Sequence, residues 1–128
     1  MKLVTWNIWE GGRDRLEKIE HVLREQDADV VALQEANDRD AAASLARALA
    51  MELVYGEANS AYAVAWLTRL PVSRRENHRL PVLDKTLLEI EVAGTRLFTT
   101  HLSAGRTLRD EPHRIEETKA VLSVAGKT

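Results

Sequence analysis

The sequence predicts an α/β fold in which one mixed β-sheet carries helices on one face. In the first half of the chain, apolar segments typical of strands alternate with amphipathic segments typical of helices, and in the second half several strands precede a helix. The apolar segments at residues 3–9, 30–33 and 63–67 are nearly continuous, which is typical of strands buried on both faces. The few helices expected cannot cover both faces of such a sheet, so we expect one face to be bare.

The elements of the first half follow from local patterns. Val, Ile and Trp residues mark the opening strand, which Gly11 and Gly12 interrupt. Leu16, Ile19 and Leu23 then recur at helical spacing. In chain order we expect a strand at 2–9, a helix at 13–26, a strand at 30–33, a helix at 38–51 and a strand at 53–55.

The second half reads mainly as strands. Pro71 ends a buried strand in a turn, and the polar segment after it is typical of an edge strand. Leu88 and Ile90 alternate with Glu89 and Glu91, as expected of a half-buried strand. We expect strands at 62–68, 72–80, 85–93 and 96–102, and then a helix near Pro112 that turns Ile115, Val121 and Leu122 inward.

Composition excludes several classes of protein. The apolar fraction of 45% and the charged fraction of 30% are those of an ordinary globular domain. The net charge of −2 provides no overall positive field to attract nucleic acid, and the absence of cysteine excludes disulfides and thiolate metal sites. The sequence has no signal-peptide core and no apolar run long enough to span a membrane, so we expect a cytoplasmic protein.

Three polar side chains lie at or near the ends of expected strands. Asn7 lies near the end of the first strand, Glu35 follows the second, and His101 lies near the end of the last. Polar groups at the carboxyl ends of buried strands are where open α/β sheets build ligand sites. Amide and carboxylate oxygens suit a hard cation such as Mg²⁺, and an imidazole suits proton transfer or phosphate contact near neutral pH.

These residues belong to four ordered motifs. They are KLVTWNI at 2–8, DADVVALQE at 27–35, AWLTRLPV at 65–72 and FTTHL at 98–102. In order and spacing the motifs resemble the N-terminal half of the endonuclease/exonuclease/phosphatase superfamily, with Thr68 where that family usually has Ser. The superfamily includes divalent-metal nucleases, sphingomyelinases and inositol polyphosphate phosphatases. We therefore identify the chain as a member by resemblance.

The resemblance implies a site and a reaction. In the family, the residues matching Asn7 and Glu35 help to bind the catalytic metal, so Mg²⁺ or Mn²⁺ is the expected cofactor. The residue matching His101 contacts the scissile phosphate or assists the leaving group, which makes Glu35 and His101 the expected catalytic residues. The reaction would be metal-assisted hydrolysis of a phosphoester carried by a small molecule, a lipid or a nucleic acid.

The resemblance also implies that residues 1–128 are the N-terminal half of a four-layered α/β sandwich. The family's second half supplies Gly-Asp-x-Asn and Ser-Asp-His motifs that orient and activate the attacking water, and neither motif occurs in this sequence. We therefore expect little hydrolysis by this chain alone, and its standing as an enzyme is left open. The second half, or a second copy of the chain in a homodimer, would cover the bare face of the sheet.

Each candidate also has a plainer interpretation. Asn7 could satisfy backbone groups at a strand end, Glu35 could be a solvated loop carboxylate, and His101 could be hydrogen-bonded in the core. The four-motif context favours metal binding for Asn7 and Glu35 and a phosphate-site role for His101. Arg106, just past His101, could also reach a phosphate. For the whole chain the alternative is a non-catalytic truncated or split-domain fragment that acts through association of its exposed sheet face.

Overall fold

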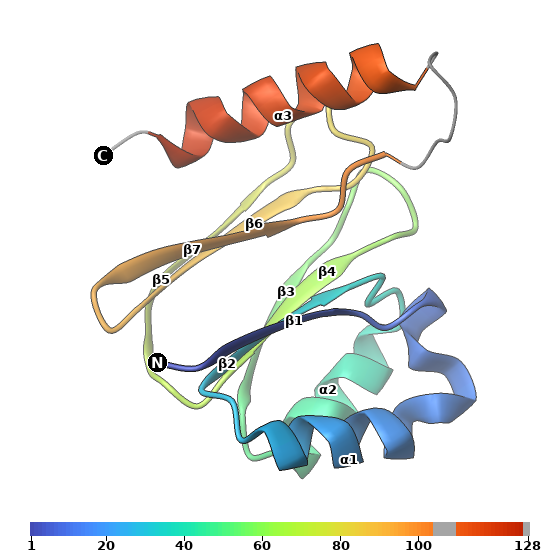
Figure 1. The fold of residues 1–128 in the computed structure, drawn as a ribbon, viewed down its shortest axis with the longest axis vertical. Helices are drawn as coiled ribbons and strands as arrows, with labels where there is room; N and C mark the ends of the chain where they lie inside the picture. Colours follow the sequence, from blue (N-terminus) through green and yellow to red (C-terminus); the bar gives the residue numbers. More distant parts are fainter. Residues whose placement is uncertain (104–109, 127–128) are drawn as a thin grey trace.

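The computed structural model describes residues 1–103 and 110–126, which form an α/β fold (Figure 1). The strands are β1 (Leu3–Asn7), β2 (Val30–Gln34), β3 (Glu52–Gly56), β4 (Val64–Thr68), β5 (Val72–His78), β6 (Leu87–Val92) and β7 (Thr95–Thr100). The helices are the 3₁₀ helix η1 (Glu10–Arg15) and the α-helices α1 (Leu16–Gln26), α2 (Arg39–Ala48) and α3 (Glu111–Ala125). The described strands form a four-stranded sheet in the order β1-β2-β4-β3 and a three-stranded sheet in the order β5-β6-β7.

Two stacked sheets replace the single sheet expected from the sequence. The predicted class is confirmed for the first sheet, which is mixed because β1 runs parallel to β2 while β4 runs antiparallel to β2 and β3. Helices α1 and α2 lie together on one face of this sheet, and the second sheet lies on its other face (Figure 1). The expectation of a bare face on the first sheet is therefore wrong, because the strands from Val72 onward fold back and cover it.

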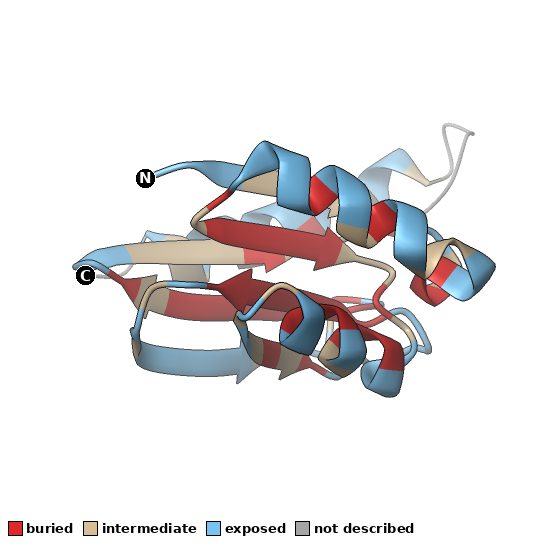
Figure 2. Cartoon of the chain, turned by 90° about the horizontal axis from the view of Figure 1, so that it is seen from below, coloured by how far each residue is buried: buried red, intermediate tan, exposed pale blue. Residues whose placement is uncertain are grey.

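Strand β2 lies at the centre of the molecule. Its side chains alternate between the two faces of the sheet, so Val31 and Leu33 pack against the helices, while Val30 and Ala32 pack against the second sheet. All four of these side chains are buried. Figure 2, seen from the side of α1 and α2, shows buried strands in the sheet behind these helices. The near-continuous apolar run at 30–33 therefore has the explanation predicted from the sequence.

The core between the sheets joins β4 to β6. Trp66 packs against Leu88 and Ile90, and its indole Nε1 donates a hydrogen bond to the Leu88 carbonyl at 3.1 Å. Complete burial of an aliphatic side chain such as Ile90 stabilises the fold by about 2 kcal/mol. The alternation of Leu88 and Ile90 with Glu89 thus orients β6 with its apolar side toward the first sheet.

Strand β1 differs from its prediction. It pairs with β2 along one edge, its side chains alternate between half-buried and exposed, and Leu3 keeps 48% of its surface exposed. The expectation that residues 3–9 are buried on both faces is therefore wrong. Strand β7 is the corresponding edge of the second sheet, and Gln34 ties both edges together, because its Nε2 donates to Thr5 Oγ1 at 3.0 Å and to Thr99 Oγ1 at 3.1 Å.

Helix α3 lies on the opposite side of the molecule from α1 and α2 (Figure 1). The prediction that it turns Ile115 and Leu122 inward is wrong, because these side chains are 50% and 65% exposed. Glu117 is the buried residue of the helix, and its carboxylate accepts hydrogen bonds from the backbone N–H groups of Ser103 and Asp84 at 2.9 and 3.1 Å. Polar contacts therefore attach α3. No helix in the described part of the chain is long and apolar enough to cross a membrane.

Candidate active site

Strands β1 and β2 bring Asn7 and Glu35 to the same end of the first sheet. The strands run parallel and Asn7 is the register partner of Gln34, so Glu35 follows one residue beyond that pair. The Asn7 side chain is exposed, and its Oδ1 accepts a hydrogen bond from the Trp9 backbone N–H at 3.0 Å. This contact directs the amide of Asn7 toward the segment that leaves the strand.

That segment wraps around Glu35. Glu35 has a φ of 55°, in the left-handed region that residues with a side chain rarely adopt. Its carbonyl accepts a hydrogen bond from the Gly11 N–H at 2.7 Å, and its carboxylate Oε1 accepts one from the Glu10 N–H at 3.3 Å. Gly11 has a φ of 76°, and a Cβ on it would lie 3.2 Å from the Asp38 nitrogen, so glycine permits this close approach. Strained backbone of this kind is common where side chains are held for function.

His101 reaches the same region from the second sheet. It follows β7, whose Thr99 is hydrogen-bonded to Gln34 directly before Glu35. Glu35 and His101 line a common pocket of about 200 Å³, together with Tyr62 and Lys85. The structure therefore brings two of the three predicted site residues into one pocket. Asn7 is not among the lining residues and lies at the adjoining strand end.

The environment of His101 favours its neutral form. Burial lowers the pKa of its imidazole, the positive charge of Lys85 lowers it further, and the carboxylates of Glu35 and Glu117 act in the opposite direction. Its Nδ1 is buried and has no hydrogen-bond partner among the described residues. The plainer interpretation, a hydrogen-bonded core histidine, therefore does not account for this nitrogen.

The sequence analysis missed Lys85 and Tyr62. The Lys85 side chain is 6% exposed, its Nζ donates to the Leu102 carbonyl at 3.3 Å, and the ammonium lies 5.5 Å from the centre of the Tyr62 ring. Both residues also line a neighbouring surface hollow of about 520 Å³ that extends past Asp84. A single lysine after an aspartate in a turn carries no sequence signal of burial, so the fold was needed to find it.

The donor atoms at Asn7 and Glu35 suit a hard divalent cation. Glu35 offers a carboxylate with one hydrogen bond from the described backbone, and Asn7 offers an amide carbonyl at the neighbouring strand end. Oxygen donors of these types are the ligands that Mg²⁺ and Mn²⁺ take in proteins. The chemistry of the donor set therefore fits the expected metal.

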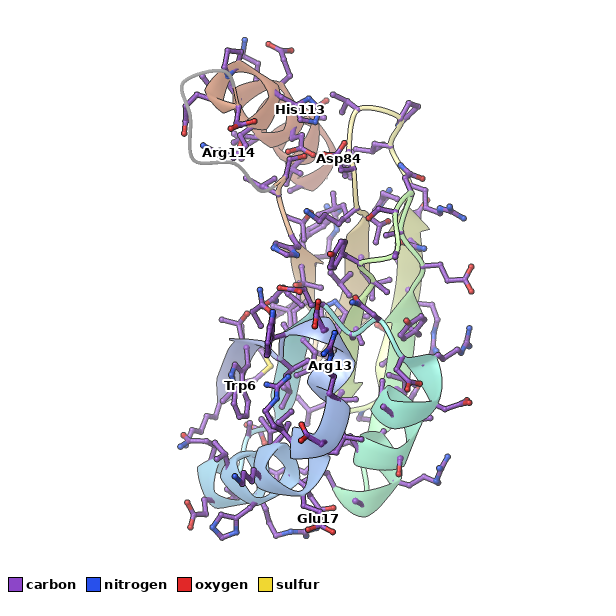
Figure 3. All side chains as sticks on the ribbon, turned by 90° about the vertical axis from the view of Figure 1, so that its right-hand side faces the viewer. Trp6, Arg13, Glu17, Asp84, His113 and Arg114 are labelled. Carbon is purple, nitrogen blue, oxygen red and sulfur yellow. The ribbon has the colours of Figure 1, made fainter. Side chains whose placement is uncertain are left out.

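Two closer groups of acidic and histidine side chains lie elsewhere in the described structure. They are Glu76, His78 and Glu89 on the second sheet, and Asp84, His113 and Glu117 between a loop and α3. Figure 3 shows Asp84 and His113 side by side, and their closest side-chain atoms are 3.4 Å apart. The buried carboxylates of both groups already accept hydrogen bonds from protein donors, which explains them without a metal. Arg106 lies outside the described residues.

A carboxylate and an imidazole thus share one pocket at the strand ends of two stacked sheets. The chain belongs to the endonuclease/exonuclease/phosphatase family, whose sequence model matches residues 4–126. This finding confirms the resemblance inferred from the four motifs. A search of curated proteins gives no match.

Solved structures agree in fold. The chain is similar to TDP2 from D. rerio in complex with a single-strand DNA product, with a TM-score of 0.80 and 20% identity over 100% of this chain and 55% of that one. It is similar to the 3′ phosphatase NExo from Neisseria bound to a product DNA hairpin, with a TM-score of 0.72 and 23% identity over 96% of this chain and 49% of that one. It is also similar to an AP endonuclease from Archaeoglobus fulgidus, with a TM-score of 0.73 and 16% identity over 96% of this chain and 50% of that one. The chain thus spans about half the length of these proteins.

Proposed function

We propose that this chain carries part of the site of a divalent-metal-dependent phosphoester hydrolase, with Glu35 and Asn7 as metal ligands and His101 at the phosphate. The observation that carries the proposal is the common pocket of Glu35 and His101 at the strand ends of a chain of this family. When bound, Mg²⁺ or Mn²⁺ would polarise the phosphoryl oxygens. Glu35 supplies the charged ligand, and Asn7 supplies a neutral one.

His101 supplies hydrogen bonding rather than fixed charge. A neutral imidazole carries one N–H donor and one acceptor nitrogen, and the lowered pKa keeps it in that form near neutral pH. Its N–H can donate to a phosphoryl oxygen or to the leaving oxygen of the ester.

The substrate class stays broad. TDP2 and NExo structures contain DNA products, which supports a nucleic acid among the candidates, and small-molecule and lipid phosphoesters remain beside it. We further propose that residues 1–128 correspond to the N-terminal half of the family's domain, since the three solved relatives are about twice as long. Hydrolysis by this chain alone should therefore be close to background. The cytoplasmic location expected from the sequence stays a prediction.

Paramagnetic broadening by Mn²⁺ tests the metal site directly. In amide NMR spectra, substoichiometric Mn²⁺ should broaden the signals of Asn7 and Glu35 first, and Glu35→Gln should abolish this effect. Glu57→Gln, which changes an exposed carboxylate, is the matched control and should leave the broadening unchanged. Broadening centred on His78 and Glu89, or persistence of the effect in Glu35→Gln, would refute the proposal.

Association is the second candidate function. The observation that favours it is that β1 and β7 are both edge strands, each hydrogen-bonded to a neighbouring strand on one side only among the described strands. These two edges lie on the same side of the sandwich, where Gln34 bonds to both. Unpaired strand edges are templates for another strand. A second copy of the chain, or the second half of the family's domain, would meet this requirement.

Sedimentation at micromolar concentration separates these states. A homodimer that Leu3→Lys dissociates, and that Val22→Lys on α1 leaves intact, would support pairing through β1. Both positions are exposed apolar residues, so the two variants are matched in chemistry. A monomer at all concentrations would rule out the homodimer.

A further inference from the structure

Lys85 is a buried cation without an ion-pair contact among the described residues, although the neighbouring Asp84 carboxylate interacts with it electrostatically. Its side chain is 6% exposed, and its two described contacts are a backbone carbonyl and the face of an aromatic ring. No described carboxylate forms an ion pair with it. An ammonium removed from water is costly unless a charge or several hydrogen bonds compensate for it, so Lys85 leaves room for an anion.

The position of Lys85 limits what that anion can be. Lys85 lines the pocket of Glu35 and His101, and it also lines the larger hollow beside it. An anion on its Nζ would therefore lie against the imidazole and beside the end of β2 where Glu35 stands. A phosphoryl group has several oxygens, so it can accept from an ammonium and from an imidazole N–H at the same time.

Tyr62 holds the ammonium in this position. The ring face lies 5.5 Å from Lys85 Nζ, within the range of a favourable cation–π contact, and Tyr62 lines both hollows with it. A ring face stabilises the cation without neutralising it. The positive charge therefore stays available to a ligand.

We infer that Lys85 is the phosphate-binding residue of this site, with Tyr62 as its positioning residue. The inference rests on the proposed function for the identity of the reacting group and extends it to a residue not assigned there. The phosphoryl group lies between Lys85 and His101, and the larger hollow past Asp84 receives the organic part of the ester. Lys85 also offsets the repulsion that the Glu35 carboxylate exerts on an anion in the same pocket.

Inorganic phosphate is the probe for a direct test in the unmodified chain. With EDTA present, the side-chain CεH NMR signals of Lys85 should shift saturably as phosphate is added, and those of Lys119, which is exposed on α3, should not. An unshifted Lys85, or equal shifts at both lysines, would overturn the inference. This measurement needs no variant, so it decides the question even where substitutions disturb folding.

Variants then separate a binding role from a structural one. Lys85→Met should weaken phosphate binding about tenfold or more, because it removes a charge-assisted hydrogen bond. Lys85→Arg should restore most of the affinity, and Lys119→Met should leave it unchanged. Wild-type affinity in a folded Lys85→Met protein would overturn the inference.

The same samples distinguish this inference from the proposed function. Mn²⁺ broadening at Glu35 should persist in Lys85→Met, because the lysine is not a metal ligand. Absence of Mn²⁺ broadening in the wild type, together with a saturable phosphate shift at Lys85, would refute the metal site and support the phosphate site. The opposite pair of results would overturn the phosphate site alone.

Discussion

Glu89 and Lys85 are two charged side chains almost completely removed from water, and their surroundings differ sharply. Glu89, on the outer face of the second sheet, accepts from Arg96 Nε at 2.9 Å and lies 2.8 Å from His78 Nε2. The hydrogen-bond and ring contacts of Lys85 are both with neutral groups, and it forms no ion pair among the described residues. Removing one partner of a compensated buried charge is strongly destabilising, whereas an unpaired buried cation in a pocket leaves a place for the charge of a ligand.

The outer face of the second sheet around Glu89 and the pocket around Lys85 also differ in the ionisation of their neighbouring groups. Hydrogen bonding from Arg96 lowers the pKa of the Glu89 carboxyl, so this group is charged under all ordinary conditions. Burial and the charge of Lys85 lower the pKa of His101, so that group is neutral at pH 7. The outer face of the second sheet is thus a closed network of paired charges, while the pocket combines an unpaired cation with a neutral imidazole.

The largest expected effect comes from opening the closed network. Glu89→Ala leaves Arg96 and His78 without their shared carboxylate, and we expect a loss of about 3 kcal/mol in the free energy of unfolding. Urea denaturation measures it. Glu91→Ala on the same face is the matched control and should cost less than about 1 kcal/mol, since that residue is only half-buried. Equal losses in both variants would contradict the comparison.

Lys85→Met should act in the opposite direction. Replacing an uncompensated buried charge with an apolar side chain of similar length should raise the free energy of unfolding by about 1 kcal/mol. The same denaturation experiment measures it, with Lys119→Met as a control of no effect. A clear destabilisation would show that the contact with the Leu102 carbonyl is structural, and the contrast with Glu89 would then disappear.

The pH dependence of stability should show two separate windows. Because the folded state lowers the pKa of His101, unfolding takes up a proton that the folded protein does not bind, so stability falls as pH drops below the ordinary histidine pKa of 6.5. His101→Gln should remove this part of the loss. The depressed pKa of Glu89 contributes stability that is present above the ordinary glutamate pKa of 4.5 and is lost as pH falls below it. Denaturation at stepped pH measures both windows, and a His101→Gln protein that still loses stability between pH 6.5 and 4.5 as the wild type does would contradict this assignment.

The smallest effect concerns the ring beside Lys85. Tyr62→Phe keeps the ring face and should leave phosphate affinity unchanged, whereas Tyr62→Leu should weaken it about threefold through loss of the cation–π contact. The phosphate titration that follows the Lys85 side chain measures both. An equal loss in the two variants would indicate that the hydroxyl, and not the ring, contacts the ligand.

Local patterns were reliable where neighbours in sequence decide the structure. The continuous run in β2 correctly indicated burial on both faces, and the alternation in β6 correctly indicated which face packs against the first sheet. The expectation that β6 is only half-buried is wrong, because Glu89 on its other face is also buried, by hydrogen bonding to Arg96. They failed for β1, because a strand at a sheet edge can carry the same apolar residues as a central one. They failed for α3, because the helix is attached through the Glu117 carboxylate and not through Ile115 or Leu122.

The sequence by itself determined the α/β class, the family and the strand ends that carry Asn7, Glu35 and His101. It could do so because strand ends and motifs are local in the chain. Only the tertiary structure decided that the strands divide into two stacked sheets and that Lys85 is buried beside Glu35 and His101. The burial of a charge depends on segments far apart in sequence that meet around it, and no local pattern records which segments those are.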